Sequence, residues 1–149
     1  LIADDVTNPP TAGTYPLEVS TSSDPIPVVT NVALQSGPTA VTSASVVVSP
    51  SGTGSVGARW TTTFTSTHQL NYYYSTITLR GPSGTTFPGS CLYQLYDTTP
   101  EPDVNLGSVC ADSGAGTDEV VLRPYADVPA GHVVKVVAND VVNPTGVAG

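Results

Sequence analysis

The feature that most limits how this chain can fold is a succession of short β-type runs separated by glycine, proline and aspartate. Residues 58–65 alternate with a period of two and are rich in strand-favouring threonine and aromatic residues. Other runs of this kind are 14–20, 28–35, 40–49, 75–80, 92–96, 104–110, 118–123 and 132–138. No segment has the apolar spacing of an amphipathic helix, so the sequence predicts an all-β fold, an antiparallel β-sandwich.

The single tryptophan indicates where the core of this sandwich lies. Trp60 and Phe64 share one face of the run 58–65, because side chains two apart point the same way along a strand. We expect Trp60 to anchor the core, with ligand stacking as the alternative role. The runs expected to pair with this strand across the core are 77–79 and 119–122.

The charge balance limits the possible partners. The 149 residues carry a formal net charge of −8, with only four lysines and arginines. Nucleic acids and anionic membranes are bound by clusters of basic residues, so neither is expected as a partner. No apolar run approaches the roughly 18 residues of a membrane span, and the absence of methionine indicates a processed chain or an excised fragment. The acidic, lysine-poor, threonine-rich composition is typical of an extracellular chain.

Cys91 and Cys110 are the only thiols in the chain. In a chain of extracellular character an even pair predicts one disulfide, and two free thiols are the alternative. Closing a loop of about 20 residues would stabilise the fold by roughly 3 kcal/mol in the chain-entropy model.

No group of residues has the pattern of a catalytic or cofactor site. His68 lies in a polar loop and His132 follows a Pro-Ala-Gly turn, so neither is expected to act as a general base. The segment 52–57 formally matches a dinucleotide loop, but a β-type run follows it where a helix is required. We therefore expect no enzymatic activity and no cofactor. Calcium is the ion to consider, and the acidic side chains that could supply oxygens are Asp4, Asp5, Asp24 and Asp140, for which turn and cap roles are the alternative.

A duplicated stretch lies near both ends of the chain. Residues 3–13 read Ala-Asp-Asp-Val-Thr-Asn-Pro-Pro-Thr-Ala-Gly, and residues 138–149 repeat Ala, Asp, Val, Asn-Pro and the closing Ala-Gly with one insertion. The two Asn-Pro pairs begin 135 residues apart (143 minus 8), a spacing that suits one whole domain. The first copy continues into the strand-like run 14–20, and no such run follows the second copy.

This duplicated boundary, followed by Thr-Tyr-Pro-Leu-Glu-Val-Ser-Thr-Ser-Ser-Asp at residues 14–24, resembles that of bacterial extracellular Ig-like repeats. The resemblance implies an Ig-like antiparallel sandwich at 25–149 that lacks its last strand, preceded by an N-terminal strand extension and linker at 1–24. It also implies a surface stalk, adhesin or fibre module without catalytic function.

Lys135 lies between valines in the run 132–138. If its face points inward, burial would lower the pKa of the amine. Extracellular pilin and adhesin sandwiches can join such a lysine to a neighbouring side chain by an isopeptide bond, for which Asn139 and Glu119 are conceivable partners. The alternative is an edge lysine whose amine reaches solvent.

Two modes of assembly are compatible with these observations. In the first, copies of the chain join head to tail into a filament, because the strand with Tyr15, Leu17 and Val19 inserts into a neighbour's sheet. The residues expected to form the acceptor end of that sheet are Asp140, Val141, Val142 and Asn143. In the second, the chain is one repeat of a long covalent adhesin stalk.

A third possibility is a carbohydrate-binding sandwich. Its candidate residues are the tyrosines at 72–74, with Tyr93 and Tyr96. Solvated loop tyrosines are the alternative reading of this group, and a surface glycan or protein ligand stays open.

Overall fold

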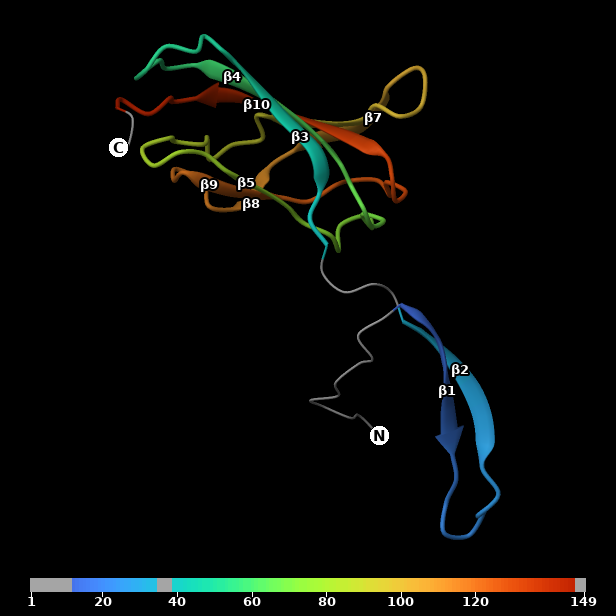
Figure 1. Ribbon diagram of the computed structural model, residues 1–149. Coiled ribbons are helices and arrows are strands. Elements are labelled where there is room, and N and C mark those ends of the chain that lie inside the picture. Colours follow the sequence, from blue (N-terminus) through green and yellow to red (C-terminus); the bar gives the residue numbers. More distant parts are fainter. Residues whose placement is uncertain (1–11, 35–38, 147–149) are drawn as a thin grey trace. The chain divides into compact units, whose positions relative to one another are not determined.

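The computed structural model describes residues 12–34 and 39–146, and it divides the chain into two compact units, Leu1–Ala40 and Val41–Gly149. The described residues contain ten strands and no helix, so the predicted all-β fold is confirmed (Figure 1). In this part of the chain no helix is long and apolar enough to cross a membrane.

The first unit contains an antiparallel hairpin of β1 (Gly13–Val19) and β2 (Val28–Leu34). The run 28–35 had been assigned to the sandwich, and the structure instead pairs its described part with β1. The reason is a chain reversal between the two strands, where the Thr21 backbone N–H donates to the Asp24 carbonyl at 3.1 Å. The boundary between the units therefore follows residue 40 rather than residue 24.

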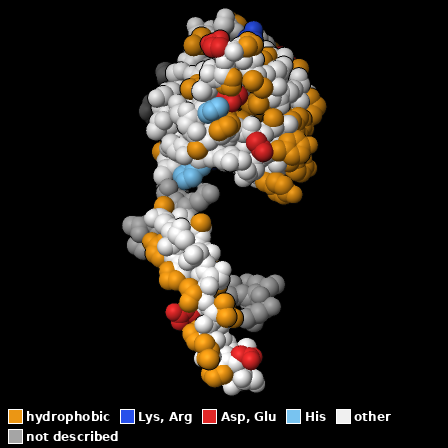
Figure 2. All heavy atoms as spheres, turned by 90° about the vertical axis from the view of Figure 1, so that its right-hand side faces the viewer, with side chains coloured by type: hydrophobic (Ala, Val, Ile, Leu, Met, Phe, Trp, Pro, Cys, Tyr) orange, Lys and Arg blue, Asp and Glu red, His pale blue; other side chains and the backbone are white. Residues whose placement is uncertain are grey.

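Apolar side chains of the hairpin are exposed on both strands, as Figure 2 shows along its length. Leu17 and Val19 on β1 are 50% and 56% exposed, and Val28 on β2 is 71% exposed. A two-stranded hairpin alone is only marginally stable in water. Exposed valines and leucines on such a hairpin indicate a segment suited to packing against another surface.

The second unit is a sandwich of two antiparallel sheets (Figure 1). The larger sheet has, in order, β3 (Thr42–Ser49), β4 (Ala58–Thr65), β10 (Val133–Val141), β6 (Tyr93–Asp97) and β7 (Val104–Val109). The smaller sheet has, in order, β5 (Ile77–Arg80), β9 (Glu119–Leu122) and β8 (Ala111–Ser113). As expected, β4 lies in the opposite sheet from β5 and β9.

The core lies between these sheets and is centred on β10, which pairs with both β4 and β6. Val134 and Val136 of β10 are fully buried, and they pack in one cluster with Leu95 of β6 and Leu122 of β9. Alternation along β10 therefore sends these valines inward and directs Lys135 to the other face.

The two sides of the sandwich are closed differently. On one side the chain passes directly from β7 in the larger sheet to β8 in the smaller one, and Cys110 is the single residue between them. The predicted disulfide is confirmed there, because Cys110 is bonded to Cys91. On the other side, β3 and β5 are the outer strands of their sheets, and no strand of the described residues lies beside them.

Candidate functional site

The candidate site is a groove of about 430 Å³ on the open side of the sandwich, between β3 and β4 of the larger sheet and β5 of the smaller one. Its apolar lining comes from both sheets and from the segments flanking β5. The main apolar residues that line it are Trp60, Phe64, Leu70, Ile77, Leu79 and Phe87. The groove thus reaches down to side chains of the core itself.

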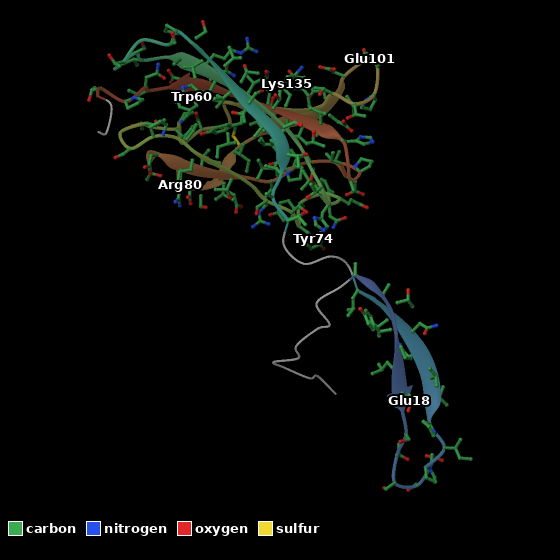
Figure 3. The ribbon with its side chains drawn as sticks, in the orientation of Figure 1. Glu18, Trp60, Tyr74, Arg80, Glu101 and Lys135 are labelled. Carbon is green, nitrogen blue, oxygen red and sulfur yellow. A yellow bond between two sulfur atoms is a disulfide. The ribbon has the colours of Figure 1, made fainter. Side chains whose placement is uncertain are left out.

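Trp60 explains why the groove is apolar yet accessible. Its indole packs edge-on against Phe87 with ring centroids 5.7 Å apart, and it is only partly buried. Its Nε1 donates to Oδ1 of Asn143 at 2.9 Å, so the polar edge of the ring is satisfied. Trp60, labelled in Figure 3, therefore packs against the core as expected, and its indole also lines the groove.

The groove is bordered by two strand edges. Among the described strands, β3 pairs with β4 alone and β5 pairs with β9 alone. Val46 of β3 lines the groove and is 52% exposed, whereas the adjacent Val47 does not line it and is 68% exposed. An exposed edge with apolar side chains is a template for pairing with another strand.

The second Asn-Pro stretch is bonded to Trp60, one of the residues that line this groove. Asn143 is buried and its Nδ2 donates to the carbonyls of Pro50 and Gly52 at 3.0 and 2.9 Å. Pro144 lies beside Gly84, in the turn after β5, and its carbonyl accepts the N–H of Gly54 at 2.9 Å. The stretch therefore links the larger sheet to the end of β5.

The predicted acceptor end needs a correction in position. Asp140 and Val141 belong to β10, an internal strand, and Val141 pairs with Ala58 of β4. Val142 pairs with Thr86, and Asn143 is hydrogen-bonded within its own chain. Since Val141, Val142 and Asn143 already have partners within the chain, the open strand edges lie at β3 and β5 instead.

The residues predicted to insert into a neighbour lie on β1. Tyr15, Leu17 and Val19 are opposite Val32, Thr30 and Val28 of β2. Leu17 and Val19 are exposed, and Tyr15 is half-buried. They occupy alternate positions of one strand, as the sequence predicted.

Lys135 does not approach either of the partners considered for an isopeptide bond. Its Nζ lies 2.5 Å from Oδ2 of Asp103 and 4.6 Å from the centroid of the Tyr96 ring. The side chain of Asn139 donates to the Leu92 carbonyl, and that of Glu119 pairs with Arg80. Neither of the two conceivable cross-link partners therefore pairs with Lys135, because alternation along β10 turns this side chain away from the core.

No metal site stands out among residues 12–34 and 39–146. No group of three His, Cys, Asp or Glu side chains that could hold a metal occurs there, and Asp4 and Asp5 lie outside the described residues. The Nδ1 atom of His132 lies 2.7 Å from Oδ2 of the buried Asp97, which also accepts the N–H of Thr99. The contact between His132 and Asp97 therefore links the start of β10 to the end of β6.

Two ion pairs lie on the smaller sheet, Arg80 with Glu119 and Arg123 with Asp112. The hydrogen bond with Glu119 raises the pKa of the Arg80 guanidinium. The hydrogen bond from Arg123 lowers the pKa of the Asp112 carboxyl. These pairs hold β5, β8 and β9 together, because their members lie on or next to those strands.

The tyrosines singled out from the sequence divide into two groups. Tyr93 is fully buried, its hydroxyl donates to the Pro88 carbonyl at 2.7 Å, and burial raises its pKa to about 12. Tyr96 lies beneath Lys135. The tyrosines 72–74 are exposed, and Tyr125, which the sequence analysis missed, lies beside Tyr72 with ring centroids 6.5 Å apart.

The groove itself was not anticipated from the sequence. Its position depends on which strands are outermost in each sheet, and no local pattern encodes that order. Comparison of the chain with protein-family models, with curated proteins and with solved structures finds no match.

Proposed function

We propose that this protein is a non-enzymatic structural subunit of an extracellular filament, in which the groove beside β5 receives a β-strand from a neighbouring copy. The observation that carries the proposal is the apolar groove of about 430 Å³ bordered by the outer edges of β3 and β5. The disulfide, the acidic composition and the resemblance to bacterial Ig-like repeats support an extracellular surface location.

A β-strand fits this groove better than a compact ligand does. An added strand satisfies the backbone groups along β5 and places every second side chain against the groove floor. The floor offers Trp60, Phe87 and Leu79 for such side chains. Insertion would also cover apolar area that otherwise faces water, at about 25 cal/mol for each Å² buried.

The direction of the inserted strand follows from the fold. Every ladder between described strands is antiparallel, so an added strand is expected to run antiparallel to β5. It would then begin beside Pro144 and Gly84 and end near Leu70 and Thr76.

The strand β1 is the segment of this chain best suited to the groove. It follows the first Asn-Pro stretch, and Pro144 of the second Asn-Pro stretch lies beside Gly84, in the turn after β5. Leu17 and Val19 of β1 are exposed. Together with Tyr15 they occupy every second position of the strand, so these three side chains share one face. Because donor and acceptor are different surfaces, each copy can bind the next and the contact builds a fibre.

The test uses two neighbouring valines on β3. Val46→Asp puts a charge into the groove, whereas Val47→Asp places the same charge on a side chain that does not line it. We expect Val46→Asp and Leu17→Asp to abolish polymers in sedimentation velocity and electron microscopy, and Val47→Asp to retain them. Polymers that survive both Val46→Asp and Leu17→Asp would overturn the proposal.

One observation also favours a second candidate, a repeat of a covalent stalk. Pro144 lies beside Gly84 in the turn after β5, so a strand that followed in a longer polypeptide could run along the edge of β5. Denaturing electrophoresis of native material distinguishes the two candidates. Subunits near 15.2 kDa support the filament, and one very large chain supports the stalk.

A further inference from the structure

We propose that four clustered tyrosines, Tyr72, Tyr73, Tyr74 and Tyr125, form a binding platform for a neutral polysaccharide. They are between 44% and 86% exposed, and none of them lines the groove beside β5. The proposal is therefore independent of strand insertion. We call these four residues the tyrosine platform.

The rings of the platform are arranged around Tyr72. Its ring centroid lies 6.2 Å from that of Tyr73 and 6.5 Å from that of Tyr125, with tilts of 41° and 53°. Tyr74 is the most exposed of the four, and Figure 3 shows it at the lower end of the sandwich. The rings of Tyr72, Tyr73 and Tyr125 thus form one aromatic surface, and Tyr74 follows Tyr73 on the same loop.

The loop that carries three of these rings is held to the sandwich by its backbone. The Tyr72 N–H donates to Oδ1 of Asp127 at 2.6 Å, and the Tyr73 N–H donates to the Pro124 carbonyl at 2.9 Å. Arg123 donates from Nη1 to the Tyr73 carbonyl at 2.9 Å. The platform is therefore preformed, which reduces the entropy lost on binding a ligand.

Tyr73 itself adopts a backbone conformation that is unfavourable for a bulky residue. Its φ of 63° lies in the left-handed region, where glycine or asparagine is the usual residue. The hydrogen bonds to Pro124 and Arg123 hold it there. A tyrosine kept in such a conformation while its ring stays 54% exposed indicates a role for the ring outside the fold.

The charges around the platform select a neutral ligand. Arg123 is its one adjacent cation among the described residues, and it is paired with Asp112 at 3.0 Å while its Cζ lies 5.5 Å from the Tyr73 ring centroid. The Asp127 carboxylate is adjacent, and the chain as a whole carries a charge of −8, so anionic ligands are repelled.

The chemistry of the rings favours sugar over an apolar protein surface. A tyrosine combines a flat apolar face with a hydroxyl group, which matches a pyranose ring with its C–H face and hydroxyl rim. The residues that flank the tyrosines on the loop are polar, namely Gln69, Asn71 and Ser75, and can hydrogen-bond hydroxyl groups.

The experiment is a calorimetric titration of the full chain with cellohexaose, chitohexaose and mannohexaose, and with hexagalacturonic acid as the charged comparison. Each titration is repeated in the Val46→Asp variant, so that binding is measured without dependence on assembly. We expect at least one neutral oligosaccharide to bind, and the acidic one to bind more weakly. Tyr72→Ala and Tyr74→Ala should each weaken binding by about tenfold or more.

Tyr96→Ala is the matched control, because Tyr96 is a partly buried tyrosine outside the platform. It should leave the affinity unchanged, and circular dichroism should show every variant to be folded. Tyr74→Ala removes the most exposed ring, so it keeps the test valid if Tyr72→Ala unfolds. The proposal is overturned if no neutral oligosaccharide binds at millimolar concentration, or if hexagalacturonic acid binds as tightly as the neutral ones. It is also overturned if Tyr96→Ala weakens binding as much as the platform substitutions do. A third contrary result would be platform substitutions that reduce self-association without changing oligosaccharide binding.

Discussion

Asn143 connects several parts of the sandwich by hydrogen bonds. Its amide binds the carbonyls of Pro50 and Gly52 and the indole N–H of Trp60, and its own backbone N–H donates to Ser55. The sequence marked this asparagine as half of a repeated dipeptide and as part of the expected acceptor end. Its role could not be predicted, because its partners are between 83 and 93 residues away along the chain.

Asn143→Ala should lower the free energy of unfolding by about 2 to 4 kcal/mol, because it leaves a buried indole N–H and two carbonyls without their partner. Chemical denaturation followed by circular dichroism measures this change. Asn139→Ala, which removes an amide bonded to the Leu92 carbonyl, serves as the control and should cost less than about 1 kcal/mol. Equal losses in the two variants would contradict the role given to Asn143.

Tyr93 makes stability depend on pH in the alkaline range. Its pKa is raised from 10.0 to about 12 by burial, so its neutral form is favoured in the folded state. The unfolded chain releases this proton first as the pH rises, so stability is complete below about pH 10 and falls as the pH approaches about 12. Denaturation midpoints measured across this range should decline in the native protein.

Tyr93→Phe should flatten this decline, even though loss of the hydrogen bond to the Pro88 carbonyl lowers stability at all pH values. Tyr74→Phe is the control, since Tyr74 is 86% exposed, and it should leave the slope unchanged. A slope that persists in Tyr93→Phe would show that another group is responsible.

At the scale of elements, strand positions were predictable and strand partners were not. Each predicted run contains a strand, because alternation and turn residues are local properties of the sequence. β8 was missed because Ala-Asp-Ser at 111–113 is too short and polar to show alternation. The pairing of β2 with β1 was also missed, since apolar alternation alone does not say which of two sheets a strand joins.

The disulfide should stabilise the closed side of the sandwich. Cys91 and Cys110 lie just outside β6 and β7, whose paired residues Tyr93 and Val109 are both buried. Replacing both cysteines with serine should cost about 3 kcal/mol on the chain-entropy estimate, measured as a lower denaturant midpoint. Treatment of the native protein with a thiol reductant should give a similar loss, whereas an unchanged midpoint in both cases would contradict this assignment.

At the scale of the whole molecule, an open groove and an exposed hairpin are complementary in chemistry. The groove has two strand edges and an apolar floor, and the hairpin has exposed leucine and valine on β1. The sequence analysis had placed the acceptor at the second Asn-Pro stretch. The acceptor at β5 could not be predicted from the sequence, because the order of strands within the two sheets is a property of the assembled fold.

Paired cysteine substitutions test the direction of the inserted strand between copies. If β1 runs antiparallel to β5, its start should lie near the end of β5, so Thr14→Cys and Arg80→Cys should cross-link under mild oxidation. Ser20→Cys with Arg80→Cys is the matched pair and should not cross-link. Dimers on non-reducing gels from the second pair alone would indicate parallel insertion, and dimers from neither pair would indicate another donor.

The partial exposure of Trp60 on the groove floor makes the chain its own fluorescent reporter. Trp60 is the only tryptophan, so all indole emission comes from that one position in the groove. A strand laid over it would replace water with apolar side chains and shift the emission to shorter wavelength. The rate of subunit assembly can therefore be measured in unlabelled protein by stopped-flow fluorescence. The Val46→Asp variant, which is not expected to receive a strand, provides the control signal.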